Sequence, residues 1–278
     1  MDKYLTSFDG IKIFYKHFKG NKDKTLVFLH GVGGNWTIWK KEINYFVEQG
    51  YSIIAPDLRG HGLSDVPEPI ERYKLNNFSK DLMEIFKKEK IKNFALIGHS
   101  FGAGIVVTYC MNKKRRMPKQ VILVEGSNVY PFDHNRLLNM NRYVTHLMRF
   151  IAAHEITKKE HFINLKDIDL TEEGIKGNIH MISYILHITP IKTMVNILDY
   201  LEEYMFKNKN KLSKTLRELT IPTIIIAGEK DQVILPEYVH LTKKEKKDAK
   251  YYLLKDCGHR APVEKPEEVT RIIEKYII

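Results

Sequence analysis

The feature that most constrains the fold is an alternation of short apolar runs with longer segments of helical period. The runs "TLVFL", "SIIA", "FALI" and "TIIIA" are continuously apolar, which is typical of strands covered on both faces. Segments 36–49 and 73–90 place apolar side chains three or four residues apart. This alternation predicts an α/β fold, with a mostly parallel central sheet and helices on both of its faces.

Further elements extend the pattern toward both ends of the chain. The stretch "IKIFYKHF", from Ile11 to Phe18, alternates apolar and polar residues, which is the period of a half-buried strand. "QVILVEG" and "KYYLLKDCGH" predict two more strands. Residues 101–111 and 266–278 predict helices, and the second of these begins with a proline, as many helices do.

The alternation stops between Pro131 and Leu212, where no convincing buried strand is found. The stretches "NRYVTHLMRFIAAHE" and "GNIHMISYILHI" predict amphipathic helices in this region. A segment of roughly eighty residues is too long for an ordinary loop. We therefore predict a core domain formed by residues 1–130 and 213–278, interrupted by a helical cap at 131–212.

The charge balance is basic, with 45 Lys and Arg against 34 Asp and Glu, a formal net charge of +11. Such an excess can indicate a nucleic acid, an anionic lipid or an anionic substrate as partner. The lysines are scattered, however, often with an acidic residue nearby, as in "TKKEKKDAK". No pattern of a known nucleic-acid-binding motif is present. We expect a solvated lysine-rich surface and no nucleic-acid partner.

The two cysteines, Cys110 and Cys257, lie far apart and match no metal-binding or redox spacing. Two free thiols are typical of a reducing compartment. The start, "MDKYLTSFDG", has no apolar region of the kind found in signal peptides, and no apolar run reaches the ~18 residues that a membrane-spanning helix needs. We therefore expect a cytoplasmic protein without stable membrane insertion.

Chemically active residues follow several of the predicted strands. In open parallel sheets, ligands bind beyond the carboxyl ends of the strands, so these segments indicate where a site would form. The segments are "HGVGG", "PDLRGHGLSD", "GHSFG", "GEKD" and "KDCGHRAP". Ser100, Asp231 and His259 thus follow three different strands and are expected at one edge of the sheet, in the chain order Ser, Asp, His.

This arrangement resembles the α/β-hydrolase family, and the resemblance covers nearly the whole chain outside the insertion. Gly98-x-Ser100-x-Gly102 matches the nucleophile elbow between a strand and a helix. The pentapeptide alone is a weak signal, since chance can produce it. Its place between a strand and a helix, together with Asp231 and His259 after the expected strands, makes the resemblance specific.

Each residue of this set has a physical role to fill. Ser100 is expected on a strained, tight turn, and glycines at 98 and 102 let the strand and helix approach each other. A serine hydroxyl needs a base, and His259 titrates nearest neutrality. Asp231 would orient the imidazole and stabilise its charged form. The backbone N–H of Phe101 would bind an oxyanion, and the resemblance implies that the N–H of Val32 would assist it.

Alternatives remain open at these positions. Ser100 could be a small residue at a tight junction, Asp231 a turn former, and His259 a buried histidine with satisfied hydrogen bonds. Glu125, after the following strand, is the fallback acid, because some family members have the acid there. The other histidines form no recognised metal-ligand set, and the glycines after His30 match no nucleotide-binding pattern. We expect neither a metal nor a cofactor.

Pocket candidates come from two regions. His30, Gly31 and His99 adjoin the predicted turns, although His30 and His99 could equally be structural. The resemblance implies that the insertion forms a lid over the site. Its aromatic and methionine side chains are the further candidates: Tyr143, Met148, Phe150, Met181 and Tyr184.

The resemblance implies a serine hydrolase that cleaves a carboxylic ester of a small or medium acyl group. The same three residues would also suit a lactonase, a thioesterase, a monoacylglycerol-lipase-like enzyme or a C–C bond hydrolase. Epoxide hydrolases and haloalkane dehalogenases are disfavoured, because they have Asp where this chain has Ser100. A ligand-binding protein without activity is a further alternative, since a fold alone does not determine function.

Overall fold

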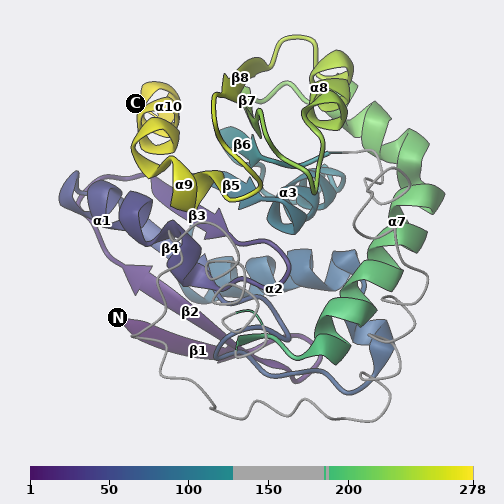
Figure 1. Ribbon diagram of the computed structural model, residues 1–278. Helices are drawn as coiled ribbons and strands as arrows, with labels where there is room; N and C mark the ends of the chain where they lie inside the picture. Colours follow the sequence, from purple (N-terminus) through teal and green to yellow (C-terminus); the bar gives the residue numbers. More distant parts are fainter. Residues whose placement is uncertain (128–184, 186–187, 278) are drawn as a thin grey trace.

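The computed structural model of the chain describes residues 1–127, 185 and 188–277, and these contain one eight-stranded sheet (Figure 1). The strands are β1 Asp2–Thr6, β2 Lys12–Phe18, β3 Thr25–Leu29, β4 Ser52–Pro56, β5 Phe94–His99, β6 Gln120–Val124, β7 Thr223–Gly228 and β8 Lys250–Leu254. All five residues of β3 and all six of β5 and β7 are buried, as their continuous apolar sequence predicts.

The strand order across the sheet is β1-β2-β4-β3-β5-β6-β7-β8. Strand β2 pairs antiparallel with both of its neighbours, and the pairs from β4 through β8 are all parallel. Strands β3 and β5 are neighbours, but the chain leaves β3 toward β4 on one side and leaves β5 toward β6 on the other. The segments that follow β3 and β5 therefore diverge, and a ligand-binding crevice is expected between them.

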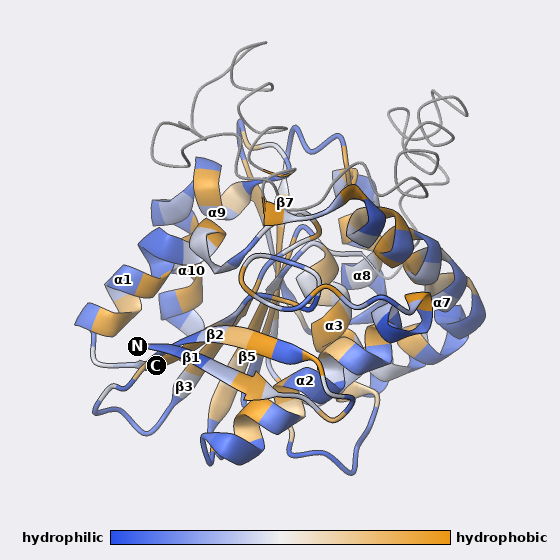
Figure 2. Cartoon of the chain, turned by 90° about the horizontal axis from the view of Figure 1, so that it is seen from below, coloured by the Kyte–Doolittle hydropathy of each residue, from blue (hydrophilic) through white to orange (hydrophobic). Residues whose placement is uncertain are grey.

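Helices cover both faces of the sheet, which is seen nearly edge-on between them in Figure 2. The α-helices are α1 Lys40–Glu48, α2 Leu75–Lys88, α3 Phe101–Cys110, α7 Ile191–Glu218, α8 Pro236–Glu245, α9 Ala261–Glu264 and α10 Pro266–Ile277. Two 3₁₀ turns, η1 Trp36–Trp39 and η2 Ile70–Tyr73, precede α1 and α2. One face packs against α2, α3, α7 and α8, and the other against α1, α9 and α10.

Strand β5 illustrates how one strand supplies both cores. Successive side chains of a strand point to opposite faces. Accordingly, Ala95 and Ile97 belong to the cluster with α1 and α10, whereas Leu96 belongs to the cluster with α2 and α3. Because both faces are apolar and buried, β5 is held rigidly and its carboxyl end is a firm support for the residues that follow it.

The predicted α/β class, a mostly parallel sheet with helices on both faces, is confirmed. Strand β1 and helix α8 were not predicted from the sequence, because both are short and the periodic signal of their sequences is weak. The segment 36–49 begins with a 3₁₀ turn rather than as one helix. The division into core and cap stays a prediction, and its boundary at 212/213 lies within the continuous helix α7.

Helix α7 is the longest helix of the described chain, and it has charged residues throughout its second half. No helix in the described part of the chain combines the length and the hydropathy that crossing a bilayer requires.

Candidate active site

Ser100 stands between β5 and α3 in a backbone conformation that serine seldom adopts. Its φ is 52° and its ψ is −115°, which is strained for a residue with a side chain. Its N–H donates to the carbonyl of Val124 on the neighbouring strand, at 2.8 Å. The turn reverses the chain sharply, so that the serine lies at the carboxyl edge of the sheet and the helix begins directly after it.

The flanking glycines are required by close backbone contacts. A Cβ atom at Gly98 would lie 2.5 Å from the carbonyl carbon and oxygen of Gly102. A Cβ atom at Gly102 would lie 2.6 Å from the carbonyl oxygen of Leu29. Neither space can accept a side chain without moving main chain, so the G-x-S-x-G sequence has a steric cause here.

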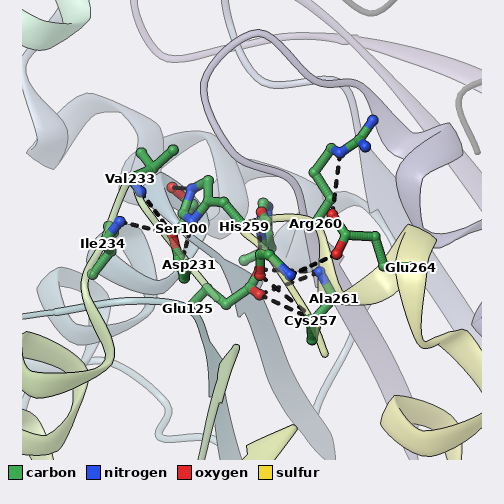
Figure 3. Close-up of polar contacts among 12 residues, drawn as sticks. Ser100, Glu125, Asp231, Val233, Ile234, Cys257, His259, Arg260, Ala261 and Glu264 are labelled. Atoms are coloured by element: carbon green, nitrogen blue, oxygen red, sulfur yellow. Dashed lines mark hydrogen bonds and ion pairs between the residues drawn. The ribbon is translucent and has the colours of Figure 1, made fainter. Parts of the chain in front are cut away.

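The structure brings Ser100, His259 and Asp231 into one hydrogen-bonded line (Figure 3). Nε2 of His259 lies 2.9 Å from Oγ of Ser100, and Nδ1 of His259 lies 2.8 Å from Oδ2 of Asp231. A carboxylate can only accept a hydrogen bond, so Nδ1 of His259 donates its proton to Asp231. In the neutral ring, Nε2 therefore has a free lone pair directed at the serine hydroxyl.

Asp231 is held in place from its other side. Its Oδ1 accepts hydrogen bonds from the backbone N–H groups of Val233 and Ile234, at 2.8 and 2.9 Å. The residue is buried, with 2% of its surface exposed. Both carboxylate oxygens thus have donors, and the side chain has little freedom to turn away from His259.

The charges around His259 favour its protonated form. Burial of the imidazole lowers its pKa, but the hydrogen bond to Asp231 and the negative charges of Asp231, Glu125 and Glu264 outweigh burial. The net result is a pKa above the ordinary value of 6.5. A raised pKa makes the ring a stronger base toward the hydroxyl it faces.

His30 orients the loop after β3. Its Nε2 accepts a hydrogen bond from the N–H of Leu58 at 2.9 Å, so its Nδ1 has the proton and donates to the carbonyl of Gly31 at 2.7 Å. The C=O and N–H of one trans peptide unit point in opposite directions. The N–H of Val32, which shares its peptide unit with the carbonyl of Gly31, therefore points away from His30.

Phe101 provides a second backbone N–H near the serine. It is the first residue of α3, and the first N–H groups of a helix have no partner within the helix. Val32 and Phe101 both line the same cavity as Ser100. The positive end of the helix dipole adds to the attraction of this region for negative charge.

A cavity of about 570 Å³ lies above these residues. Helix α7 contributes Leu198, Leu201 and Met205, and the segment after Asp231 contributes Val233 and Ile234. These side chains are apolar, so the space suits an organic group rather than an ion.

The sequence-based pocket predictions had three outcomes. Gly31 and His99 do line the cavity. His30 is not among the described residues that line this cavity, since it is fully buried and its two ring nitrogens bind groups within the protein. The candidates from the insertion lie outside the described residues: Tyr143, Met148, Phe150, Met181 and Tyr184.

The residues of α7 that line the cavity lie within the segment 131–212 predicted as a lid, but sequence reasoning named none of them. A signal was available, because Leu198, Leu201 and Met205 recur at helical spacing on one side of this helix. The same spacing also fits ordinary core packing. Only the position of the helix beside Ser100 distinguishes the two.

A second histidine and carboxylate lie beside the line. Nε2 of His99 lies 2.9 Å from Oε2 of Glu125, and one potential metal-ligating atom from each of His99, Glu125 and His259 falls within 4.8 Å of the others. Both ring nitrogens of His259 are engaged with Ser100 and Asp231, and Nε2 of His99 with Glu125. Hydrogen bonds among side chains account for this group, and we assign no metal to it.

The fold and this strand–serine–helix turn define a class. The model of the α/β hydrolase fold family matches residues 24–171, more than half of the chain. The chain belongs to the α/β hydrolase family.

Three similar proteins differ in their length and in the activity, if any, that their names state. Protein ABHD8 of Homo sapiens is 27% identical over 259 residues, which cover 92% of this chain and 55% of that protein. This chain thus spans little more than half the length of ABHD8. Epoxide hydrolase 3 of Xenopus tropicalis is 23% identical over 288 residues, covering 96% of this chain and 75% of that protein. An esterase of Exiguobacterium antarcticum has a TM-score of 0.76 with 21% identity, covering 99% of both chains.

Proposed function

We propose that the protein is a serine hydrolase that cleaves a carboxylic ester of a small or medium acyl group. The observation that supports this most is the hydrogen-bonded line from Ser100 through His259 to Asp231, beneath an apolar cavity. Ser100 is the nucleophile, His259 the general base and acid, and Asp231 the group that orients the imidazole.

The first half of the reaction transfers the acyl group to the protein. Oγ of Ser100 attacks the carbonyl carbon of the ester while its proton moves to Nε2 of His259, 2.9 Å away. The carbonyl π electrons move to oxygen, and a tetrahedral oxyanion forms. When the oxyanion collapses, the bond to the alcohol breaks and His259 returns the proton to the departing oxygen. An acyl ester of Ser100 and a free alcohol result.

The second half uses water in place of the alcohol. His259 takes a proton from water, whose oxygen attacks the acyl carbon, and the resulting intermediate expels Oγ of Ser100 as His259 returns the proton. In both halves the oxyanion accepts hydrogen bonds from the N–H groups of Val32 and Phe101. The orientation that His30 imposes on the Gly31 peptide supports this role for Val32. Loss of one such donor typically costs about 3–4 kcal/mol of transition-state stabilisation.

The side chain at position 100 bears on which family chemistry applies. The epoxide hydrolases and haloalkane dehalogenases of this family attack with an Asp carboxylate, whereas here the atom facing His259 is the hydroxyl oxygen of Ser100. A serine hydroxyl activated by a histidine suits acyl transfer. Lactones, thioesters and activated C–C bonds present an equivalent carbonyl carbon. A panel of such substrates beside simple esters would rank them.

The test compares two serines of the same cavity. Ser100→Ala should lower turnover of short p-nitrophenyl esters to the background rate while thermal unfolding is unchanged. Ser127 also lines the cavity, and its hydroxyl donates to the carbonyl of Tyr238. Ser127→Ala is the matched control and should keep turnover within about twofold, because its hydroxyl donates to a backbone carbonyl. Turnover that survives Ser100→Ala would remove the serine from its role.

A further inference from the structure

The pair formed by His99 and Glu125 has no part in the chemistry described above, yet it lies directly behind it. The rings of His99 and His259 have their centroids 5.1 Å apart. Glu125 is fully buried, and a buried carboxylate is costly unless it is hydrogen-bonded. Apolar side chains at positions 99 and 125 would avoid this cost, so the hydrogen bonds of His99 and Glu125 are expected to serve a purpose.

Nε2 of His99 is shared between two acceptors. It lies 2.9 Å from Oε2 of Glu125 and 2.9 Å from the backbone carbonyl of His259. A carboxylate and a carbonyl accept hydrogen bonds, so Nε2 has the proton and donates to both. The hydrogen bond to the carboxylate orients the His99 ring, and the same proton then reaches the backbone of His259.

Glu125 contacts the same segment two residues later. The N–H of Ala261 donates to its Oε2 at 3.1 Å and to its Oε1 at 3.3 Å. The thiol of Cys257 lies 4.0 Å from Oε1. Glu125 thus holds the N–H of Ala261, as Figure 3 shows, and His99 holds the carbonyl of His259. The two contacts lie on either side of the Cα of Arg260.

Surrounding backbone leaves little room for this arrangement to change. Glu125 has a φ of 51°, a strained value for a residue with a side chain. A Cβ atom at Gly228 would lie 2.2 Å from the carbonyl oxygen of Gly258 and 2.9 Å from Oε1 of Glu125. Gly258, directly before His259, is therefore packed closely against Gly228 of β7, and the backbone from His259 to Ala261 is hydrogen-bonded to His99 and Glu125.

We propose that His99 and Glu125 are positioning residues that fix the backbone of His259 and so aim its imidazole at Ser100. This inference rests on the proposed hydrolase function. The Glu125 charge also contributes to the protonation of His259, together with the other groups that face the ring. Those other groups are Asp231 after β7, Glu264 of α9, His99 of β5 and Ser100 at the start of α3.

The central variant is Glu125→Gln, which keeps the size of the side chain and removes its charge. The amide oxygen can still accept from His99 and Ala261, as Oε2 does now, but the bond from His99 loses the negative charge of its acceptor. The amide N–H₂ would take the place of Oε1 and face the N–H of Ala261, donor against donor. We expect kcat for a p-nitrophenyl ester to fall about tenfold with KM nearly unchanged, since a displaced base slows chemistry more than binding. The acid limb of the pH–rate profile should move to lower pH.

Two substitutions of His99 separate hydrogen bonding from packing. His99→Gln places an amide N–H₂ near the position of Nε2 and can donate to both acceptors, so kcat should stay within about threefold of wild type. His99→Phe keeps a ring and removes the donor, and kcat should fall about tenfold. The matched control is Glu42→Gln, which removes a buried carboxyl from α1 and should leave kcat and the pH profile unchanged.

A second readout does not depend on activity. The Cε1–H signal of His259, followed by NMR across pH, should titrate at lower pH in Glu125→Gln than in wild type and Glu42→Gln. If wild type fails to hydrolyse any ester, the proposed function fails, while this titration still decides whether Glu125 acts on His259. An unchanged titration and unchanged kcat in folded Glu125→Gln would overturn the inference. So would equal losses of kcat in His99→Gln and His99→Phe.

Discussion

Two histidine–carboxylate pairs lie side by side at the carboxyl edge of the sheet. In each, a ring nitrogen lies 2.8 or 2.9 Å from a carboxylate oxygen: His259 with Asp231, and His99 with Glu125. They differ in the remaining nitrogen. That of His259 faces the hydroxyl of Ser100, whereas Nδ1 of His99 is buried and has no hydrogen-bond partner among the described residues. The partner of the remaining nitrogen, more than the histidine–carboxylate pair itself, thus decides which histidine can act as a base.

Access separates the two pairs as well. The side chain of His259 is 17% exposed and lines the cavity, so a substrate can approach the ring. His99 is held under the loop after β3, where a Cβ atom at Gly31 would lie 3.0 Å from its Nδ1. His99 also borders the cavity, but its side chain is only 9% exposed and its Nδ1 is buried, so a substrate has less access to this ring than to that of His259.

The largest difference in kcat between the two pairs is expected when the carboxylate of each pair is replaced by an amide. Asp231→Asn replaces an acceptor with an amide that can donate to Nδ1 of His259, which moves the proton to Nε2 and removes the lone pair that faces Ser100. We expect kcat to fall on the order of 10⁴-fold. The corresponding change in the second pair, Glu125→Gln, is expected to cost about tenfold. Stopped-flow ester hydrolysis measures both, and equal losses would contradict the difference between the pairs.

The next prediction concerns the pH dependence of kcat/KM. His259 must be neutral to accept the serine proton, and its pKa lies above 6.5 because burial is outweighed by Asp231 and the nearby acidic charges. Activity should therefore be low in acid and rise with pH through a midpoint above 6.5. Weakening those charges lowers the pKa, so residual activity in Asp231→Asn should have its acid limb at lower pH. A wild-type midpoint below 6.5 would contradict this assignment.

The smallest effect on activity is expected from Glu42, a buried carboxyl without a pair. Among the described residues, neither of its carboxyl oxygens has a hydrogen-bond partner. Burial raises the pKa of Glu42 well above the ordinary 4.5, and the charge of Glu267 adds to the rise. A carboxyl with a raised folded-state pKa favours folding at low pH, and that stability is lost as pH rises from about 4.5 through the folded value.

Glu42→Gln cannot ionise and should be more stable than wild type at neutral pH by about 1–2 kcal/mol. The difference should shrink below about pH 4.5, where the wild-type carboxyl is protonated in both states. Urea unfolding at neutral and acidic pH measures it. A variant less stable than wild type at neutral pH would show that the carboxylate has a stabilising partner.

Much of this molecule is predictable from sequence because its main signals are local. Continuous apolar runs identify the buried strands, and the G-x-S-x-G spacing predicts the strained turn at Ser100. The sequence offers two acids after neighbouring strands, Asp231 and Glu125, and does not determine which one contacts His259. That depends on side-chain geometry across the sheet, where Oδ2 of Asp231 lies 2.8 Å from Nδ1.

Contacts between distant segments explain what was missed. His99 and Glu125 are 26 residues apart, and no spacing rule pairs them. His30 was predicted to line the pocket, but its two nitrogens bind backbone groups of its own loop and of Leu58. Patterns of residue type indicate what a side chain can bind, and only the packed chain determines which partner it meets.

The most direct test of the central assignment is to map where a fluorophosphonate attaches. The reagent phosphonylates a serine only where a neighbouring base activates the hydroxyl and nearby donors stabilise the oxyanion. Peptide mass spectrometry of the labelled wild-type protein should find one adduct, on Ser100. The adduct should be absent in Ser100→Ala and formed much more slowly in His259→Gln. An adduct that persists in Ser100→Ala, or a folded wild-type protein that is not labelled at Ser100, would contradict the assignment.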